Sequence, residues 1–385
     1  MEGEIRFMNE VFRIITGALR LDTEKVRNYS AFLAKKLEDA GEKGSADRLR
    51  KLLEETDHEL RPAGVAVARA IPVDSESRFS LLERVNLKID EPPVVLSEPQ
   101  RATMNEFLSV AKSHAQLEAE GVTTSLSLIL YGPPGCGKSR LARHIARELE
   151  LDLYVARLDG IISSYLGSTS KNIRALFDFA ARNPCVLFLD EFDAIAKLRG
   201  DVQELGELKR VVNSFIQNLD TVGRQSVILA ATNHEELLDS AVWRRFAYRL
   251  ELSYPDAPLR DELWRRFLRR VTFGPKALEV LVDLSEGFSG SDIEETCLRL
   301  RRLEVTARRA ATLHDAFHVL QNLALGEGET RRVLSAAKGK DLGDVAALLR
   351  TRNEKLYSHA ILAQLFGVSK ATAFRLSRHE GAEHA

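Results

Sequence analysis

A glycine-rich stretch is the part of this sequence whose residue types and spacing are best suited to chemistry. It follows the apolar run 126–131, leads into the helix-prone segment 140–150, and consists of Gly132, Pro133, Pro134, Gly135, Cys136, Gly137, Lys138, Ser139 and Arg140. Glycines let such a loop curl so that backbone N–H groups point inward, and the next helix N-terminus adds partial positive charge. Lys138 can then reach the outer phosphates of a nucleotide, and Ser139 can hold Mg²⁺. The spacing predicts a cradle for a nucleoside triphosphate.

Three more candidate residues follow two further apolar runs. Asp190 and Glu191 come directly after the run 186–189, and Asn233 follows the run 227–232. A rigid strand end would let Asp190 organise the Mg²⁺ shell and would place Glu191 to take a proton from an attacking water. Asn233 can hydrogen-bond that water or the γ-phosphate. Together with the cradle, these residues predict hydrolysis of the nucleotide.

Alternating strands and helices must position these residues. Strands are predicted at 126–131, 151–158, 185–190, 226–231 and 248–252, with helices between them at 171–181 and 205–219. Such alternation is typical of an α/β fold with a doubly wound parallel sheet that helices cover on both faces. The ligand of such a sheet lies at the carboxyl ends of its strands. Asp190 and Asn233 are both expected there.

The combined motifs resemble those of the AAA ATPases. The resemblance rests on Asp190-Glu191 after the cradle, on Ala230-Ala-Thr-Asn233, and on Leu237-Leu-Asp-Ser-Ala-Val-Trp-Arg-Arg-Phe246. The adjacent arginines are most similar to the spastin and katanin (meiotic) branch, here as a stand-alone ATPase of bacterial type. The resemblance spans residues 94–309. It implies a P-loop (AAA+) sheet domain and a helical lid that use ATP and Mg²⁺, and it implies a ring, usually a hexamer, as the working form.

The resemblance also implies a role for each matching residue. It assigns phosphate and Mg²⁺ binding to Lys138 and Ser139, metal organisation to Asp190, water activation to Glu191 and nucleotide sensing to Asn233. Arg244 and Arg245 match the arginine fingers that one subunit inserts into its neighbour's site. A guanidinium there would stabilise charge on the phosphoryl group, on the order of 10³-fold in rate or more. A solvated arginine pair at a helix end is the alternative, and the division of the role between the two stays open.

Two loops and a helical lid are expected to serve the substrate and the base. Tyr165 and Leu166 match the aromatic and aliphatic pair of the family's first pore loop, where a ring of such side chains could grip an extended polypeptide. A tyrosine that packs at a helix start is the alternative, and residues 199–209 occupy the place of the second pore loop. Gly290 and Ser291 lie where the lid is expected to approach the base and ribose. The lid helices are predicted at 261–270, 275–284 and 291–309.

The regions outside the resemblance are also predicted to be largely helical. Apolar residues fall near helical spacing at 5–19 and 26–37, and a third helix is expected to start behind Ser45 or Asp47. Residues 1–60 are thus either a docking bundle or helices packed on the rest of the protein. A linker with one or two short ordered pieces is expected at 61–93. The other boundaries are expected at 94–254 for the sheet domain, 255–310 for the lid and 311–385 for a C-terminal extension.

The C-terminal extension has the spacing of a helix-turn-helix at 358–379, with Gly367 at the turn and Ser369 capping the second helix. From 331 to 385 there are ten Lys plus Arg and five Asp plus Glu, a local charge of +5. A helix pair that docks a protein or packs in the ring is the alternative to DNA binding. The residues that would face a DNA backbone or groove are Lys370, Thr372, Arg375 and Arg378.

Composition sets the outer limits. The chain has 385 residues, of which 44% are hydrophobic and 29% charged, so it can form two or three domains with sizeable cores. Its net charge of −1 excludes a global attraction to nucleic acid or anionic membranes. Cys136, Cys185 and Cys297 lack CxxC spacing, which argues against a disulfide framework or zinc site. With neither a signal peptide nor a membrane-spanning stretch in the sequence, we expect a cytoplasmic protein without membrane contact.

Two functions of different classes follow from these observations. The first is an ATP-driven motor that remodels, unfolds or disassembles protein or peptide substrates through a central pore. A separate protease or effector would be its partner, because no HExxH motif occurs in the sequence. The second is an ATP-dependent regulator that the C-terminal segment addresses to DNA.

Overall fold

The computed structural model divides into two compact units, residues 1–71 and 72–385. The residues that it describes are 23–55, 71–74, 79–87, 94–122, 125–158, 166–194, 215, 219, 226–323, 334 and 342–378. Within these residues, no helix is both long and apolar enough to cross a membrane.

The first unit contains a helical hairpin. α2 (Thr23–Asp39) and α3 (Lys43–Glu55) pack against each other, and Ala34 and Ala46 are buried. Between them, Gly41 turns the chain with a φ of 88°, a conformation that glycine adopts without strain. The helix expected at 26–37 is confirmed, and the one expected at 5–19 lies outside the described residues.

The start of the third N-terminal helix was predicted wrongly. We expected it behind Ser45 or Asp47, but α3 begins at Lys43 and contains Gly44. The physical reason is that the turn needs only one glycine with a positive φ, so the second glycine can enter the first helical turn.

The second unit is built on a six-stranded sheet with the strand order β1-β3-β4-β5-β2-β6. The strands are β1 (Glu83–Val85), β2 (Ser127–Tyr131), β3 (Leu153–Arg157), β4 (Val186–Asp190), β5 (Val227–Thr232) and β6 (Tyr248–Glu251). β1 runs antiparallel to β3, and all other neighbours are parallel. The predicted α/β sheet is confirmed, and the five predicted strands agree with the observed ones. The edge strand β1, which falls in the expected linker, was not predicted.

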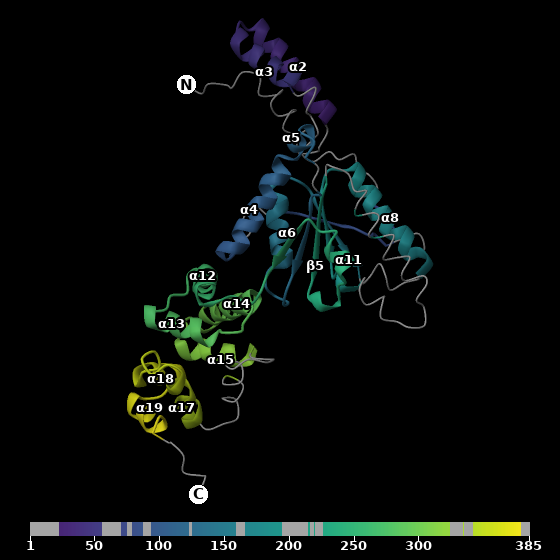
Figure 1. Ribbon diagram of the computed structural model, residues 1–385. Helices are drawn as coiled ribbons and strands as arrows, with labels where there is room; N and C mark the ends of the chain where they lie inside the picture. The colour runs from purple at the N-terminus through teal and green to yellow at the C-terminus, as the bar shows by residue number, and fades with distance from the viewer. Residues whose placement is uncertain are drawn as a thin grey trace, which may run out of the picture. The chain divides into compact units, whose positions relative to one another are not determined.

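Helices cover both faces of this sheet (Figure 1). α4 (Glu98–Lys112), which continues into the short α5 (His114–Ala119), and α6 (Lys138–Glu148) share one apolar core with Leu128 and Leu130 of β2. On the opposite face, Tyr154 of β3 packs edge-on against Phe179 of α8 (Leu166–Arg182), with ring centroids 4.9 Å apart. Burial of both faces explains why the strands read as continuous apolar runs.

The lid and the C-terminal helices form one apolar core. The lid consists of α12 (Ala257–Leu268), α13 (Pro275–Leu284) and α14 (Gly290–Ala307), and the later helices are α15 (Leu313–Leu323), α17 (Leu342–Arg352), α18 (His359–Phe366) and α19 (Lys370–Leu376). Trp264, Leu281, Phe317 and Leu362 are buried in the same cluster. The three predicted lid helices are observed, with α13 at the predicted bounds. Residues before and after the expected domain boundary at residue 310 therefore pack in one core and stabilise each other.

Helices α18 and α19 form the predicted helix-turn-helix. Gly367 ends α18 with a φ of 68°, and Ser369 caps α19, because its Oγ accepts a hydrogen bond from the N–H of Thr372 at 3.1 Å. Nδ1 of His314 in α15 lies 2.9 Å from the carbonyl oxygen of Leu365, which can only accept. This bond fixes the turn to the rest of the core.

A half-buried carboxylate anchors α17 and its C-terminal turn to the lid. Asp283 of α13 accepts a hydrogen bond from the Tyr357 hydroxyl at 2.5 Å and one from Arg352 Nε at 3.0 Å. Burial raises the pKa of Tyr357, so this hydroxyl keeps its proton and remains a donor. The lid and the C-terminal helices are thus joined by polar as well as apolar contacts.

Candidate nucleotide site

A cavity of about 700 Å³ lies where β2, β4 and β5 end, and the lid helices α12 and α14 also contribute to its lining. This volume is in the range of small-molecule pockets. Gly132 and Pro133 of the predicted cradle are not in its lining. The predicted site residues that do line it are Pro134, Gly135, Cys136, Gly137, Lys138, Ser139, Arg140, Asp190, Glu191, Asn233, Gly290 and Ser291.

Two glycines of the predicted cradle lie too close to neighbouring residues to carry a side chain. Gly132 has a φ of 124°, and a Cβ there would lie 2.5 Å from the backbone oxygen of Leu252, just beyond β6. Gly135 has a φ of 78°, and a Cβ there would lie 2.5 Å from Oγ of Ser289 in the lid. Only glycine combines these backbone angles with such close neighbours.

Lys138 is buried at the start of α6, and its ammonium group is bonded to the loop itself. Nζ donates to the carbonyl oxygens of Gly132 at 2.6 Å and Pro133 at 2.9 Å. Burial lowers the pKa of Lys138, because desolvation disfavours the charged form. A phosphate oxygen, with its negative charge, is a stronger acceptor than a carbonyl. The residue is therefore placed where it can exchange loop carbonyls for a phosphate group.

Glu191 leaves β4 in a strained backbone conformation. Its φ of 54° lies in the left-handed region, which costs a residue other than glycine roughly 1–3 kcal/mol. Its N–H donates to Oδ1 of Asp190 at 3.0 Å, and the N–H of Phe192 donates to the carbonyl of Ala231 in β5 at 2.8 Å. These bonds hold the turn and leave the Glu191 side chain exposed at the cavity. This strain was not predicted from the sequence.

Asn233 is exposed at the cavity, directly after β5. The buried Thr232 holds the backbone on both sides of it. Oγ1 of Thr232 donates to Asp193 at 3.3 Å and accepts a hydrogen bond from the N–H of His234 at 3.0 Å. The Asn233 side chain is therefore presented to the cavity by a fixed backbone.

Ser139 and Asp190 provide oxygen donors that fit Mg²⁺. Both line the cavity, and Mg²⁺ typically takes one or two protein oxygens while substrate phosphates and waters complete its octahedron. Among the described residues there is no group of three or more His, Cys, Asp or Glu that could hold a metal. The donor set is thus one that needs a phosphate ligand to complete a magnesium site.

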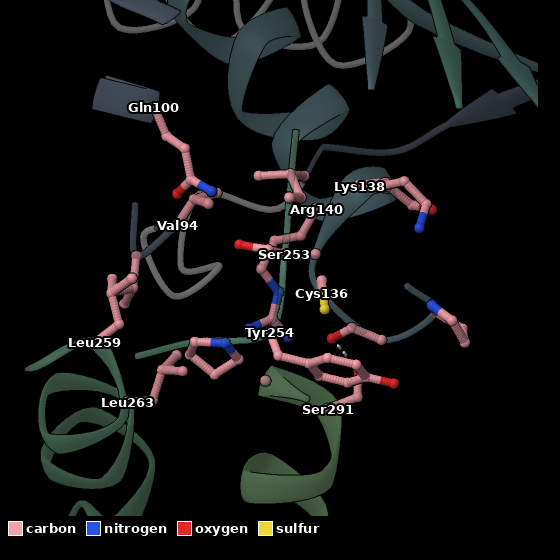
Figure 2. A pocket seen from close by; sticks show the side chains of 18 of the residues that line it. Val94, Gln100, Cys136, Lys138, Arg140, Ser253, Tyr254, Leu259, Leu263 and Ser291 are labelled. Carbon is pink, nitrogen blue, oxygen red and sulfur yellow. Dashed lines mark hydrogen bonds between the residues drawn. The ribbon is translucent and has the colours of Figure 1, made fainter. Parts of the chain in front are cut away.

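One wall of the cavity is apolar, and it was not identified from the sequence. Val94, Val95, Leu259, Leu263 and Phe267 line it. Figure 2 shows Val94, Leu259 and Leu263 on one side of the cavity and Lys138 on the other. An apolar wall across the cavity from a phosphate cradle suits the flat base of a nucleotide. The recurrence of apolar residues every four positions in α12 was a usable signal, although it does not distinguish a cavity wall from a core.

The N-terminus of α14 docks directly on the cradle. Ser291 donates both its N–H and its hydroxyl to the carbonyl oxygen of Gly135, each at 3.1 Å. A Cβ on Gly290 would lie 3.6 Å from the same oxygen. Arg140 of α6 adds an ion pair with Glu294 of α14 at 2.7 Å. The lid therefore contacts the cradle through its backbone and through a pair of charges.

The three cysteines are free thiols. Burial raises the pKa of Cys136, in the cradle, to about 11 and that of Cys185 to about 12. Burial also raises the pKa of Cys297. A thiol with such a pKa is almost wholly protonated at neutral pH and reacts slowly.

Arg244 and Arg245 do not line the cavity, and both are exposed. They directly follow the short helix α11 (Ser240–Trp243). The carboxylate of Asp239 caps this helix by accepting a hydrogen bond from the N–H of Val242 at 2.9 Å. The structure thus separates the two arginines from the other predicted catalytic residues of the same chain.

Contacts with β2 and β6 hold the arginine end of α11 in place. The Trp243 ring packs edge-on against Tyr131, with centroids 5.1 Å apart, and the Arg249 guanidinium lies 5.7 Å from the Trp243 ring. Ser127 donates its hydroxyl to the carbonyl of Arg245 at 3.1 Å. Because Tyr131 is the last residue before the cradle, the cradle and the arginines are attached to the same strand.

Most of the predicted pore-loop residues lie outside the described residues. These are Tyr165 and residues 199–209, and the side chain of Leu166, the first residue of α8, lies outside them too. Of the helix predicted at 205–219, the structure describes Phe215 and Leu219, which are both helical and buried.

The fold and this cavity define a nucleoside triphosphatase of the P-loop class. Residues 128–254 match the model of the "ATPase family associated with various cellular activities (AAA)". The chain is 34% identical to the uncharacterized AAA family ATPase y4kL of Sinorhizobium fredii over 289 residues, which are 74% of this chain and 85% of that relative. The chain therefore belongs to the AAA family of ATPases, and it binds and hydrolyses ATP.

Two further comparisons extend this result. The chain is 30% identical over 308 residues to the ATP-dependent zinc metalloprotease FtsH 2 of Bdellovibrio bacteriovorus, and it spans about half of that relative (77% of this chain, 48% of the relative). A solved FIGL-1 AAA domain in complex with ADP superposes with a TM-score of 0.53 at 23% identity, over 69% of this chain and 93% of that one. That likeness is one of fold, and it confirms the sheet and lid architecture.

Proposed function

We propose that this ATPase assembles into a ring, a hexamer by family resemblance, and uses ATP hydrolysis to remodel, unfold or disassemble protein substrates through a central pore. The observation that carries the proposal is that Arg244 and Arg245 are exposed and lie outside the cavity of their own chain. A cation that is to stabilise the transferred phosphoryl group must lie within contact distance of it. These arginines meet that condition only in the site of a neighbouring copy.

Within the cavity, the proposal gives each residue a separate task. Lys138 and the cradle N–H groups bind the phosphates, and the apolar wall holds the base. Glu191 accepts a proton from the attacking water, and Asn233 orients that water. Mg²⁺, held by Ser139 and Asp190, would neutralise phosphate charge when bound.

The ring arrangement is tested by mixing two inactive variants. Glu191→Gln lacks the base but keeps the arginines, and the double variant Arg244→Ala/Arg245→Ala lacks the arginines but keeps the base. In a ring with head-to-tail contacts, an equal mixture restores about a quarter of the sites, because each site needs one intact half from each subunit. We expect hydrolysis to recover to about that fraction of the wild-type rate.

Two outcomes would contradict the ring. One is a mixture that stays as inactive as its components. The other is full-rate hydrolysis by a strictly monomeric wild-type chain in analytical ultracentrifugation. Lys276→Ala/Arg302→Ala, at exposed cations of the lid outside the cavity, is the matched control for loss of two surface charges.

Substrate threading rests on Tyr165 and Leu166, which match the family's pore-loop pair. The name of the FtsH 2 relative couples ATP use to a zinc protease. The present sequence contains no HExxH motif, and our proposal assigns any proteolysis to a partner. Capture of proteins from native cells with Glu191→Gln supplies candidate substrates, because this variant binds ATP and stalls. Tyr165→Ala should then hydrolyse ATP but fail to unfold a captured substrate, and equal unfolding by wild type and variant would contradict threading.

A second function, an ATP-dependent regulator that binds DNA, is favoured by one observation. The C-terminal α18 and α19 have the turn and the cap of a helix-turn-helix, a motif that places its second helix in the major groove. The two functions share the ATPase and differ in whether Tyr165 grips a substrate and in what α19 contacts.

A further inference from the structure

Helix α19 presents a basic surface that carries an exposed aromatic ring. The surface, called here the α19 face, consists of Lys370, Ala371, Phe374, Arg375 and Arg378, all of which are exposed. Residues three or four positions apart lie on the same side of a helix, as do Lys370 and Phe374 or Ala371 and Arg375, and Arg378 follows in the next turn. On the opposite side, Ala373 is buried in the core that α19 shares with the lid.

The charge of this surface is of one sign. From residue 358 to residue 378 the sequence contains Lys370, Arg375 and Arg378 but no Asp or Glu. Within the described part of the chain, none of these three side chains is paired with a carboxylate, whereas the exposed arginines Arg265 and Arg266 of the lid each are. A cation cluster without internal partners is the electrostatic footprint of a polyanion site.

The first residue of α18 completes the surface. His359 lines a shallow hollow together with Lys370, Ala371, Phe374 and Arg375, and its ring centroid lies 5.0 Å from that of Phe374. Neither His359 nor Phe374 was identified from the sequence as part of a surface. The hollow brings together the start of one helix and the exposed side of the next.

Hydrogen bonds from two neighbouring segments hold His359 in position. Arg350 of α17 lies 2.8 Å from its Nε2, which must accept because the guanidinium can only donate. Ser377, after α19, lies 3.0 Å from the same nitrogen. The face is thus built on helices whose mutual positions are fixed, as a protein surface that reads a rigid ligand requires.

We infer that the α19 face binds double-stranded DNA, with α19 in the major groove. The groove is about 12 Å wide and admits one helix. Lys370, Arg375 and Arg378 can neutralise phosphates or reach guanine O6 and N7, and Ala371 and Phe374 offer apolar contact to a thymine methyl group. The inference goes beyond the motor and holds whether or not substrates are threaded, and it assigns the surface on which the second function would depend.

The environment of Phe374 favours a duplex over a single strand. Proteins that bind single strands stack successive bases on open aromatic faces. The Arg378 guanidinium lies over the Phe374 ring, 4.6 Å from its centroid, and the His359 ring packs against it as well. Stacking of a base would have to displace one of these groups, whereas contact with a methyl group in a groove needs only the exposed ring edge.

The inference is tested by fluorescence anisotropy with the full chain and a labelled duplex of about 30 base pairs and mixed sequence, over a series of salt concentrations. The test variant is Lys370→Ala/Arg375→Ala/Arg378→Ala. We expect it to bind at least tenfold more weakly at low salt, with a log–log salt slope shallower by roughly 0.9 for each phosphate that the variant no longer neutralises. Arg270→Ala/Lys276→Ala/Arg302→Ala, at three exposed cations of the lid region, is the matched control and should bind like wild type. Thermal unfolding shows whether each variant is folded.

Several outcomes would overturn the inference. These are equal duplex binding by the triple variant and wild type, equal weakening in the triple variant and the control, or tighter binding of the matching single strand. Capture of an acidic protein that competes at the same residues without any duplex binding would also overturn it and assign the face to a protein partner. Because the two inactive variants of the subunit-mixing experiment change residues outside the α19 face, failure here and failure of the ring proposal are distinguishable.

Discussion

Two groups of polar residues that were predicted to act on ATP differ in how the chain holds them. In the cavity, Lys138 is buried against loop carbonyls, and Asp190 accepts a hydrogen bond from its neighbour. Beyond α11, Arg244 and Arg245 are exposed and outside the cavity. On our proposal, one chain therefore carries the binding half of its own site and the charge-stabilising half of its neighbour's.

The two groups are nevertheless mounted on shared packing. Phe192, next to Glu191, and Phe246, next to Arg245, are buried with ring centroids 5.5 Å apart. Edge-to-face ring pairs contribute about 0.5–1.5 kcal/mol beyond their buried area. The packed rings thus connect the turn that carries Glu191 with the segment that carries Arg245. The difference between the two regions can be tested by substitutions in either one.

The largest expected effect separates binding from turnover. Lys138→Ala should weaken ATP binding about 100-fold or more, because the phosphates lose their charge-assisted donor. Arg244→Ala/Arg245→Ala should bind ATP within about twofold of wild type and lose about 10³-fold in turnover. Calorimetric ATP binding and steady-state hydrolysis measure the two quantities. Equal reductions of ATP affinity in both variants would abolish the distinction between the regions.

The next effect concerns the contact of the cradle with the lid. Gly135→Ala should weaken ATP binding roughly tenfold or more, because its Cβ would meet Ser289 at 2.5 Å. Gly121→Ala is the matched control, since Gly121 has a similar φ of 76° and nothing within 4 Å of a Cβ. ATP titration and thermal unfolding of both variants separate the clash from the shared backbone strain. If Gly121→Ala weakened ATP binding as much, the clash would not be the cause.

A smaller effect is expected where the two regions meet. Trp243→Ala should lower the turnover number about tenfold with little change in KM, because the arginine end of α11 loses its support against Tyr131. Trp243→Phe keeps an aromatic edge there and should retain most of the activity. Steady-state kinetics of both variants are the measurement. A rise in KM with an unchanged turnover number would assign Trp243 to ATP binding instead.

The smallest effect is a pH dependence in the cavity. Because the pKa of Cys136 is raised to about 11, its alkylation by iodoacetamide should be slow at neutral pH and about tenfold faster for each pH unit up to that value. The folded state prefers the protonated thiol, so its contribution to the free energy of unfolding is lost as pH rises from about 9 to 11. Bound ATP should slow the labelling. Mass spectrometry of labelled peptides is the measurement, and rapid alkylation of Cys136 at pH 7 would contradict the prediction.

Much of the fold could be predicted because its signals are local. The five parallel strands read as apolar runs between turns, and α13 begins at a proline and was predicted at its observed bounds. The edge strand β1 was missed because its three residues are exposed or half-buried and gain their pairing only from β3. The start of α3 was predicted wrongly because Gly41 and Gly44 were interpreted together as a single helix break.

By itself, the sequence determined the phosphate cradle, the acids at the end of β4 and the helix-turn-helix. Each of these features depends on a few consecutive residues, so a short sequence motif is sufficient to predict it. Only the tertiary structure decided that Val94 and Leu263 share a wall of the cavity, that Arg244 and Arg245 lie outside it, and that the C-terminal helices belong to the core of the lid. These features arise from packing between residues far apart in the chain, and local periodicity carries no information about which buried surfaces meet.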